Sequence, residues 1–369
     1  MTPASISRRQ FLAAAGLAFT SLALAGCGAS AVSSPSVTAS KPASAAASNQ
    51  PSPLTPAVTI KVADGQSLTQ AGLYIATDKG YFQEEGLNVD LLPLSNFETI
   101  IQSLTTGDIA VGLGGVSPAL FNAFSRGIDL RIVAAAALHA PGRSQLVVAR
   151  KDLVESGGLK TYADMKGKKI SRAAAFSVDT MAMEKALNMG GLTLNDAEFI
   201  TLAFPDTVAA LANKAVDIAY LSEPFATSSI DKGFAVKWHE MADFIPNHAG
   251  SLWLYSQALV EKQPEVGRRF VAAMLRGVRD YEDAFGGKNK GRADVIASLI
   301  KHTPVKDASL YDRMVAVKYP TSGELPVDTL QEDLAWLNSH GTVPQPPDLT
   351  KVLDTDFSDY ASQRLGPYQ

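Results

Sequence analysis

Residues whose types and spacing could support catalysis are few in this chain of 369 residues. The segment Gly115-Val116-Ser117-Pro118-Ala119 approaches a nucleophile elbow, but it lacks the second glycine and has proline where the turn must tighten. His239-Glu240 is not followed by a second histidine four residues after the first, and the five histidines and one cysteine form no metal-ligand pattern. We therefore predict a protein that is not an enzyme and holds no metal or cofactor.

Polar and aromatic residues instead follow the predicted strands. In α/β sheets a ligand binds beyond the carboxyl ends of the strands, where loops and helix N-termini meet. The loops at residues 64–69, 94–96, 112–117 and 174–180 occupy such places, and glycines in the third allow close backbone approach to a ligand. The sequence thus predicts a small-molecule site with these candidate residues: Gln66, Ser67, Ser95, Asn96, Gly115, Val116, Ser117, His139, Phe176, Ser177, Asp179, Thr180, Tyr220 and Glu223.

The candidates also have interpretations that involve no ligand. The following four suit the start of a helix, the first three as caps and the last as a surface acid beside the helix dipole: Ser117, Ser177, Asp179 and Glu223. Phe176, Tyr220 and Trp253 would equally serve a hydrophobic core. His139 would equally lie in a solvated loop after the fourth strand. Both interpretations stay open at the level of sequence.

Two hydrophobic patterns alternate from residue 58 onward. Short β-rich segments lie at residues 58–63, 89–93, 109–113, 130–136, 146–149, 169–172, 199–202 and 218–221. Helical patterns lie between them at residues 73–82, 97–105, 118–125, 180–189, 207–214 and 224–232, and the chain after residue 264 is mostly helical, with 264–285 the longest pattern. Strands that alternate with helices of this length predict an α/β protein with mainly parallel sheets.

Two segments of the chain repeat one another weakly. Residues 104–118 and 211–224 each run from a helix end through an Asp-Ile-Ala strand and a short loop to a residue before proline. Proline suits the first turn of a helix because its missing N–H needs no partner there. The repeat predicts two similarly built lobes, each presenting a strand C-terminus and a helix N-terminus.

The N-terminus has the features of an exported lipoprotein. Arg8-Arg9 precede an uncharged apolar stretch at residues 11–25, which is too short to span a bilayer and is typical of a twin-arginine signal. Leu24-Ala25-Gly26-Cys27 is similar to a bacterial lipobox, and Cys27, the only cysteine, has no partner for an internal disulfide. We predict a twin-arginine lipoprotein signal at residues 1–26, then a lipidated Cys27 with a disordered linker to residue 57. A plain signal with an incidental cysteine is the alternative.

The charge of the chain limits its partners. The formal net charge is −4, and removal of residues 1–26 with their two arginines takes it to −6. This sign argues against binding to nucleic acid or to an anionic bilayer by bulk attraction. The predicted location is outside the cytoplasm, with the lipid on Cys27 as the membrane anchor.

A series of motifs gives the chain a family resemblance. Residues 74–89 (YIATDKGYFQEEGLNV) resemble the opening motif of the nitrate/sulfonate/taurine-type solute-binding proteins of ABC importers, a group that includes binders of thiamine pyrimidine precursors. The resemblance covers about residues 58–240, and its further motifs lie at residues 103–111, 127–130, 163–170, 191–196, 209–211 and 216–224.

The resemblance implies a type II periplasmic-binding-protein fold, with two α/β lobes and a ligand cleft between them. Lobe I would hold residues 58–149 and 244–369, and lobe II residues 150–243. A protein of this family captures a small solute by lobe closure and delivers it to a membrane permease driven by an ATPase. The implied protein is a monomer, and a sulfonate or taurine-like anion is the favoured ligand.

The chain departs from the family pattern in two places. Gln70-Ala71-Gly72 stands where many members have a turn with proline, and Ala175-Phe176-Ser177 replaces a glycine-rich turn. A phenylalanine there would narrow the pocket, which argues against a small hydrated anion such as nitrate and favours a ligand that can stack. A pyrimidine or other heteroaromatic is therefore the alternative ligand. An enzyme on the same fold and a surface sensor are the less favoured functions.

Overall fold

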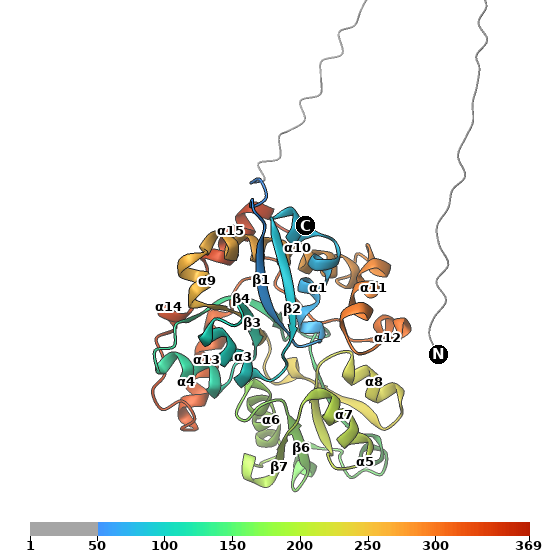
Figure 1. The fold of residues 1–369 in the computed structure, drawn as a ribbon. Helices are drawn as coiled ribbons and strands as arrows, with labels where there is room; N and C mark the ends of the chain where they lie inside the picture. Colours follow the sequence, from blue (N-terminus) through green and yellow to red (C-terminus); the bar gives the residue numbers. More distant parts are fainter. Residues whose placement is uncertain (1–50) are drawn as a thin grey trace, which may run out of the picture. The chain divides into compact units, whose positions relative to one another are not determined.

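The computed structural model describes residues 51–369 and contains two five-stranded sheets (Figure 1). Residues 1–50, with the predicted signal, Cys27 and most of the predicted linker, lie outside the described residues. We call each sheet with the helices packed against it a lobe. The α/β fold class with two lobes is confirmed, and both sheets are mixed rather than mainly parallel.

The first sheet has the strand order β2-β1-β3-β10-β4. Strand β1 is parallel to β2 and β3, and β10 runs antiparallel between β3 and β4. Its strands are β1 (Val58–Asp64), β2 (Leu87–Pro93), β3 (Val111–Gly114), β4 (Leu130–Leu138) and β10 (Ala249–Ser256).

The second sheet has the order β7-β6-β8-β5-β9, which repeats the pattern of the first. Strand β6 is parallel to β7 and β8, and β5 runs antiparallel between β8 and β9. Its strands are β5 (Leu146–Arg150), β6 (Lys169–Arg172), β7 (Glu198–Thr201), β8 (Ile218–Leu221) and β9 (Ala235–Glu240). Strands β3 and β8, which carry the sequence repeat, are both third in their sheets.

Fifteen α-helices are described within residues 51–369. Those of the first lobe before the crossing are α1 (Ala71–Asp78), α2 (Tyr81–Glu84), α3 (Phe97–Thr106) and α4 (Pro118–Ser125). Those of the second lobe are α5 (Lys151–Glu155), α6 (Val178–Met189), α7 (Phe204–Ala212) and α8 (Phe225–Asp231). The remaining helices are α9 (Gln257–Lys262), α10 (Pro264–Phe285), α11 (Arg292–His302), α12 (Ala308–Arg313), α13 (Val327–Ser339), α14 (Leu349–Val352) and α15 (Asp356–Leu365).

The long helix α10 matches its predicted bounds and packs closely on α1. A Cβ atom added at Gly277 would lie 2.1 Å from the carbonyl oxygen of Gly72. Side chains at these two positions would therefore force the helices apart. None of the helices described in residues 51–369 has the length and apolar character needed to cross a membrane.

Some predicted elements were wrong in detail. Strands β9 and β10 were not predicted, and β10 is buried along nearly its whole length. A strand buried on both faces lacks the alternation by which a half-buried strand is recognised. The helix predicted at residues 73–82 is two helices, because Gly80 has a φ of 77° and ends the first.

The chain crosses between the lobes after β4 and again after β9. Strand β5, which the predicted boundary at residue 150 assigns to lobe I, pairs with β8 and β9 in the second sheet. Figure 1 shows β6, β7 and helices α5 to α8 as a separate group beside the first lobe. The exact lobe boundaries in residue numbers stay a prediction.

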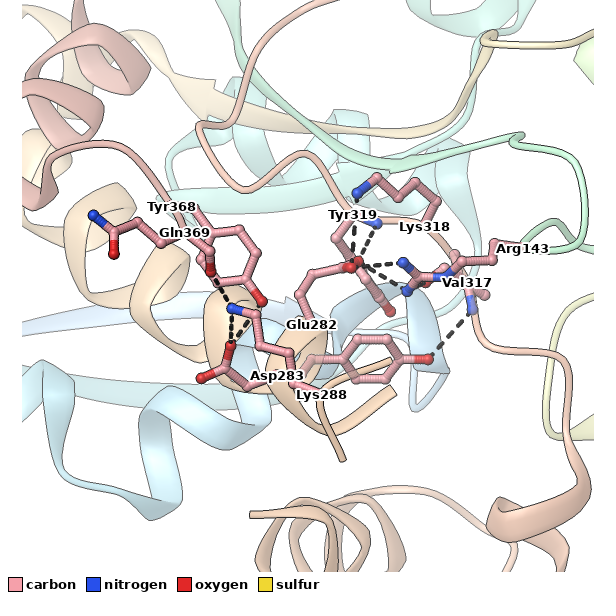
Figure 2. Close-up of polar contacts among 10 residues, drawn as sticks. Arg143, Glu282, Asp283, Lys288, Val317, Lys318, Tyr319, Tyr368 and Gln369 are labelled. Carbon is pink, nitrogen blue, oxygen red and sulfur yellow. Dashed lines mark hydrogen bonds and ion pairs between the residues drawn. The ribbon is translucent and has the colours of Figure 1, made fainter. Parts of the chain in front are cut away.

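Arg143, at the first crossing, is anchored to the first lobe (Figure 2). Its guanidinium binds both carboxylate oxygens of Glu282 on α10, at 2.6 and 3.0 Å, and donates to the carbonyl of Val317 at 2.9 Å. Glu282 is 3% exposed and also accepts from the backbone N–H of Tyr319 at 2.9 Å. A bidentate pair holds both planes in one orientation, so the crossing chain has a fixed point on α10.

The same helix holds the C-terminus of the chain. Asp283 binds Lys288 at 2.7 Å and accepts a hydrogen bond from the hydroxyl of Tyr368 at 2.7 Å, and Lys288 also contacts the Gln369 carbonyl (Figure 2). The first crossing and the chain end are therefore both held at the same end of α10.

We expect Glu282→Ala to lower the free energy of unfolding by about 2 kcal/mol, because it leaves the half-buried Arg143 guanidinium and the buried N–H of Tyr319 without their acceptor. The exposed Glu155, 3.7 Å from Lys151, provides the control. Glu155→Ala should change stability by less than about 0.5 kcal/mol. Denaturant unfolding of both variants measures the difference, and equal effects would contradict the anchoring role of Glu282.

Candidate functional site

The loop between β3 and α4 presents buried residues at the start of a helix. Ser117 stands at the N-cap position of α4 and is buried, as is Val116 before it, whereas Gly115 is half-buried. The hydroxyl of Ser117 makes no capping hydrogen bond and has no hydrogen-bond partner within residues 51–369. The helix-cap interpretation therefore does not account for this hydroxyl.

The loop between β6 and α6 carries the corresponding residues of the second lobe. Ser177 donates to the carbonyl of Ala174 at 3.0 Å and contacts Asp179. Asp179 is buried and accepts from the backbone N–H groups of Ala173 at 2.8 Å and Thr180 at 2.9 Å. These two side chains bond within the loop, but the Ser177 side chain makes no capping hydrogen bond to α6, so the interpretation of its hydroxyl as a helix cap is wrong. The hydroxyl of Thr180 is buried without a partner in the described part of the chain.

These two loops meet at helix α13, which the sequence analysis did not connect with the site. Three residues of α13 line a narrow cavity with one residue of the first loop and two of the second: Asp333, Trp336, Leu337, Val116, Ser177 and Val178. The cavity has no room for the centre of a water molecule. We call the place where the two loops and α13 meet the lobe junction. No motif in residues 327–339 marked this helix, because its contribution depends on how the C-terminal segment packs back onto both lobes.

A connected series of buried polar residues continues from the lobe junction. Asp333 binds the His248 ring at 2.8 Å. A charge–charge interaction with His248 in turn contributes to the lowered pKa of His139. A Cβ atom added at Gly250 would lie 3.0 Å from Gln145 Oε1 and 3.5 Å from His139 Nε2, so both atoms lie over the same residue of β10.

The series ends at the second lobe. Tyr220 on β8 shares a hydrogen bond with Gln145. The nearby Asp179 carboxylate adds to the burial that raises the pKa of the Tyr220 hydroxyl. Ser251 follows Gly250 on β10 and is buried. Gln145, His248 and Ser251 were not predicted. Gln145 and His248 lie in the first and second crossing segments and Ser251 lies on the buried strand β10, and none of these three segments has a sequence signal.

Six polar atoms of these residues are buried without a hydrogen-bond partner among residues 51–369. They are Ser117 Oγ, His139 Nε2, Gln145 Oε1, Thr180 Oγ1, Ser251 Oγ and Asp333 Oδ2. Buried polar atoms in folded proteins are almost always paired, so a group of this size needs an explanation. The predicted solvated-loop position of His139 is wrong, since its side chain is buried.

The candidates in the first two loops of the first lobe lie apart from this series. Gln66, Ser95 and Asn96 are exposed, and Asn96 caps α3 by accepting from the N–H of Thr99 at 3.0 Å. Ser67 is buried and shares a hydrogen bond of 2.6 Å with Thr69. The hydrogen bonds of Gln66, Ser67 and Asn96 within the described residues stay within the first lobe.

The aromatic candidates pack against protein. Phe176 has a φ of 52°, a left-handed conformation that usually requires glycine, and its ring lies 6.2 Å from Trp336 of α13. Tyr220 packs edge-on against Phe204 at 5.7 Å. Trp253 packs edge-on against Phe270 and belongs to the core of the first lobe.

Glu223 is fully buried, so its interpretation as a surface acid is wrong. It accepts from the backbone N–H of Thr227 at 3.0 Å, from the Thr227 hydroxyl at 2.8 Å and from the N–H of Val315 at 3.2 Å. The last bond joins the start of α8 to the segment after α12. Glu223 therefore contacts both lobes, although its carboxylate is already partnered.

Burial shifts the pKa values of the acidic and histidine side chains at and near the lobe junction. It raises the pKa of Asp179, Asp333 and Glu223, and hydrogen bonds to each carboxylate oppose that rise. Burial, with a smaller contribution from His248, lowers the pKa of His139 to about 3, so its ring is neutral at pH 7. Residues 51–369 contain no group of three or more His, Cys, Asp or Glu side chains that could hold a metal ion.

The sequence has relatives among binding proteins. A binding protein of Brucella abortus is 28% identical over 68% of this chain and 73% of its own length. The formylaminopyrimidine-binding protein of Halalkalibacterium halodurans is 22% identical over 74% of this chain and 82% of its own length. The riboflavin-binding protein of Chloroflexus aurantiacus is 28% identical over 78% of both chains.

Solved structures share the fold at low sequence identity. The nitrate-binding protein of Synechocystis has a TM-score of 0.70 at 16% identity, over 84% of this chain and 89% of its own. The alkanesulfonate-binding protein of Xanthomonas axonopodis has a TM-score of 0.62 at 16% identity, over 80% and 98%. The desulfurization enzyme DszB also has it, with a TM-score of 0.60 at 16% identity, over 84% and 99%.

The resemblance seen in the motifs is confirmed by a match to a whole family. The sequence profile of the NMT1/THI5-like family matches residues 68–283, more than half of the chain. The chain belongs to the NMT1/THI5-like family and has the two-lobed α/β fold of the periplasmic solute-binding proteins.

Proposed function

We propose that this protein is the solute-binding component of an ABC importer. It captures a small organic molecule at the lobe junction and delivers it to a permease driven by an ATPase. Because the cavity there is too narrow for a water molecule, the junction must widen to admit the solute. The observation that carries the proposal is the group of six buried, unpartnered polar atoms at and beside the junction of the two lobes. Family membership and the fold of solute-binding structures support it.

The energetic cost of these atoms argues for a ligand. A buried polar group without a partner destabilises the folded state by about 1 to 3 kcal/mol. Six such groups would be a poor arrangement for stability alone. A bound solute that pairs with them would recover much of this free energy, and since both lobes contribute, it would favour the closed arrangement.

The nature of the unpartnered atoms favours a ligand that donates hydrogen bonds. Gln145 Oε1 can only accept, Asp333 Oδ2 accepts when the carboxylate is ionised, and hydroxyls can accept as well as donate. A sulfonate group offers only acceptor oxygens, so it would leave the pure acceptors unpaired. Of the two ligand hypotheses from the sequence, the heteroaromatic is therefore favoured over the sulfonate.

The charges near the junction support the same choice. Arg172 faces Asp179 and offsets its charge, and Lys185 binds Glu332 at 3.1 Å. Neither cation is among the buried unpartnered groups of residues 51–369. A neutral or weakly basic ring with N–H groups fits this balance better than an anion does. Two relatives are named for pyrimidine and flavin ligands, which belong to the same chemical class.

The structure offers no reason to propose catalysis. Ser117 and His139 are the reactive groups of the junction, and His139 Nδ1 lies 3.1 Å from Ser144, not from Ser117. The shared fold of DszB shows that enzymes occur on this architecture. We propose binding without turnover, which incubation of bound ligand with purified protein and mass analysis would test.

A thermal-shift screen of the purified protein against aminopyrimidines, flavins, alkanesulfonates, nitrate and aromatic acids should identify a heteroaromatic ligand. At 100 times its dissociation constant, the ligand should stabilise the protein by about 2.7 kcal/mol. The double variant Ser117→Phe, Ser177→Phe should weaken binding by more than about tenfold, because both side chains would fill the junction.

Ser156→Phe, at an exposed position of the second lobe, is the control and should bind as the unmodified protein does. Stabilisation by sulfonates alone would reject the heteroaromatic assignment but keep solute binding. Normal affinity in the double variant would reject the lobe junction as the site.

We expect His139→Gln to reduce the loss of unfolding free energy that the protein undergoes as the pH falls below 7. The unfolded chain binds a proton at His139 below about pH 6.5, whereas the folded protein does so only near pH 3, so wild-type stability falls as the pH drops through this interval. Between pH 7 and pH 4.5 the wild type should lose about 2 kcal/mol more than the variant. Urea unfolding at both pH values measures this, and parallel losses would contradict a buried neutral ring.

We also propose that Cys27 carries the membrane anchor after export through the twin-arginine route. Cys27→Ser should abolish incorporation of radiolabelled palmitate and move the protein from the membrane fraction to the extracytoplasmic soluble fraction, because the thioether to the lipid cannot form. Replacing Arg8 and Arg9 by lysine should instead retain the precursor in the cytoplasm. Continued labelling of the Cys27→Ser variant would contradict the predicted lipidation site.

A further inference from the structure

Asp333 is the buried acid at the lobe junction that the sequence did not single out. It lies on α13, is 2% exposed, and its Oδ1 accepts a hydrogen bond from the His248 ring at 2.8 Å. Its Oδ2 has no hydrogen-bond partner within residues 51–369. One half of the carboxylate is therefore held and the other half is unused.

The position of Asp333 lies between the two lobes. It lines the narrow cavity with Val116, from the loop before α4, and with Ser177 and Val178, at the start of α6. Residue 333 lies outside the segment matched by the family profile, residues 68–283. The carboxylate therefore comes from the C-terminal part of the chain and is placed at the junction by the packing of α13.

The neighbouring basic groups His248 and Lys185 offset the charge of Asp333 in part, but they give Oδ2 no hydrogen bond within residues 51–369. Lys185 binds Glu332 at 3.1 Å, and the other ring nitrogen of His248 lies 3.4 Å from the same Glu332. Glu332 is about half exposed, so this pair faces solvent whereas Asp333 faces the cavity. A purely structural aspartate that only oriented His248 would need one oxygen, and an asparagine could supply it.

We infer that Asp333 is a specificity-determining residue for the transported solute, whose Oδ2 accepts a hydrogen bond from an N–H group on a heteroaromatic ring. His248 acts as a positioning residue that holds the carboxylate at the correct angle. This inference rests on the proposed function and adds to it the group that selects an amino-substituted ring over the same ring without the amino group.

The inference predicts opposite effects on binding and on stability. In the free protein an unpartnered carboxylate oxygen in a buried site is destabilising, and burial raises the pKa of Asp333 accordingly. Asp333→Asn keeps the shape and the oxygen that accepts from His248, but it removes the charge. The unliganded variant should therefore unfold at the same temperature as the wild type or at a higher one, while its ligand recognition is lost.

Isothermal titration with 4-amino-2-methylpyrimidine and 2-methylpyrimidine tests the role directly, because these probes differ only in the amino group. The wild type should bind the amino compound about tenfold more tightly or better, the gain typical of a hydrogen bond to a charged group. Asp333→Asn should reduce this preference to about one. Asp328→Asn, the same substitution at an exposed position of α13, should keep it.

A second variant covers the case in which Asp333→Asn folds poorly. His248→Gln leaves the carboxylate in place but removes the ring that orients it, and it should lower the preference for the amino compound without abolishing binding of the ring. Retention of the full preference in Asp333→Asn, or a large loss of unliganded stability in that variant, would overturn the inference.

The failure of the inference can be told apart from the failure of the proposed function. Wild-type protein that binds ethanesulfonate and neither pyrimidine overturns the role of Asp333 and leaves solute binding intact. Wild-type protein that binds none of these compounds, and whose radius of gyration does not change with any of them in small-angle scattering, overturns both.

Discussion

The chain passes between its two sheets twice, and the ion pair of Arg143 with Glu282 fixes the first of these passages. The pair is bidentate, and Glu282 is nearly fully buried on α10. Strand β5 follows the first crossing and β10 follows the second, and each runs antiparallel within its sheet. The register of each sheet therefore depends on where the crossing chain is held. A buried charge pair provides a fixed point for this purpose, since either partner alone would be strongly unfavourable.

Helix α13 connects this framework to the site. It joins the second lobe through two polar contacts, Glu332 with Lys185 at 3.1 Å and the Trp336 ring N–H with Glu184 at 2.5 Å. It also carries Asp333, Trp336 and Leu337 to the lobe junction. The same helix therefore provides polar contacts between the lobes and part of the cavity lining. This dual position couples the arrangement of the lobes to whatever occupies the junction.

The polar residues at the junction make sense as a binding surface rather than as a core. A protein selected only for stability would place apolar side chains there, because unpaired buried groups are costly. Phe176 in the second lobe has a strained backbone, because it adopts a left-handed conformation that glycine would adopt freely. Its ring packs near Trp336, so the strained residue belongs to the contact between α6 and α13. Local costs concentrate where the two lobes meet, as expected for a functional site.

The sequence by itself determined the fold class, the family and the two loops that meet at the lobe junction. Alternating strand and helix patterns, the motifs at residues 74–89 and the repeat around Asp108 and Asp217 depend on short-range periodicity and composition, which a linear sequence displays directly. Ser117, Ser177 and Asp179 were found because turn and cap residues follow strands at predictable places.

Only the tertiary structure decided which of these residues share a site and what chemistry the site offers. Ser95 and Asn96 occupy an equivalent loop but face solvent, whereas His139 and Glu223, which the sequence allowed on the surface, are buried. Asp333 and Gln145 come from segments without motifs, and their roles arise from contacts with residues far away in the chain, such as that of Asp333 with His248, 85 residues apart. The unpaired state of a polar atom depends on what packs around it, and that is a property of the folded structure alone.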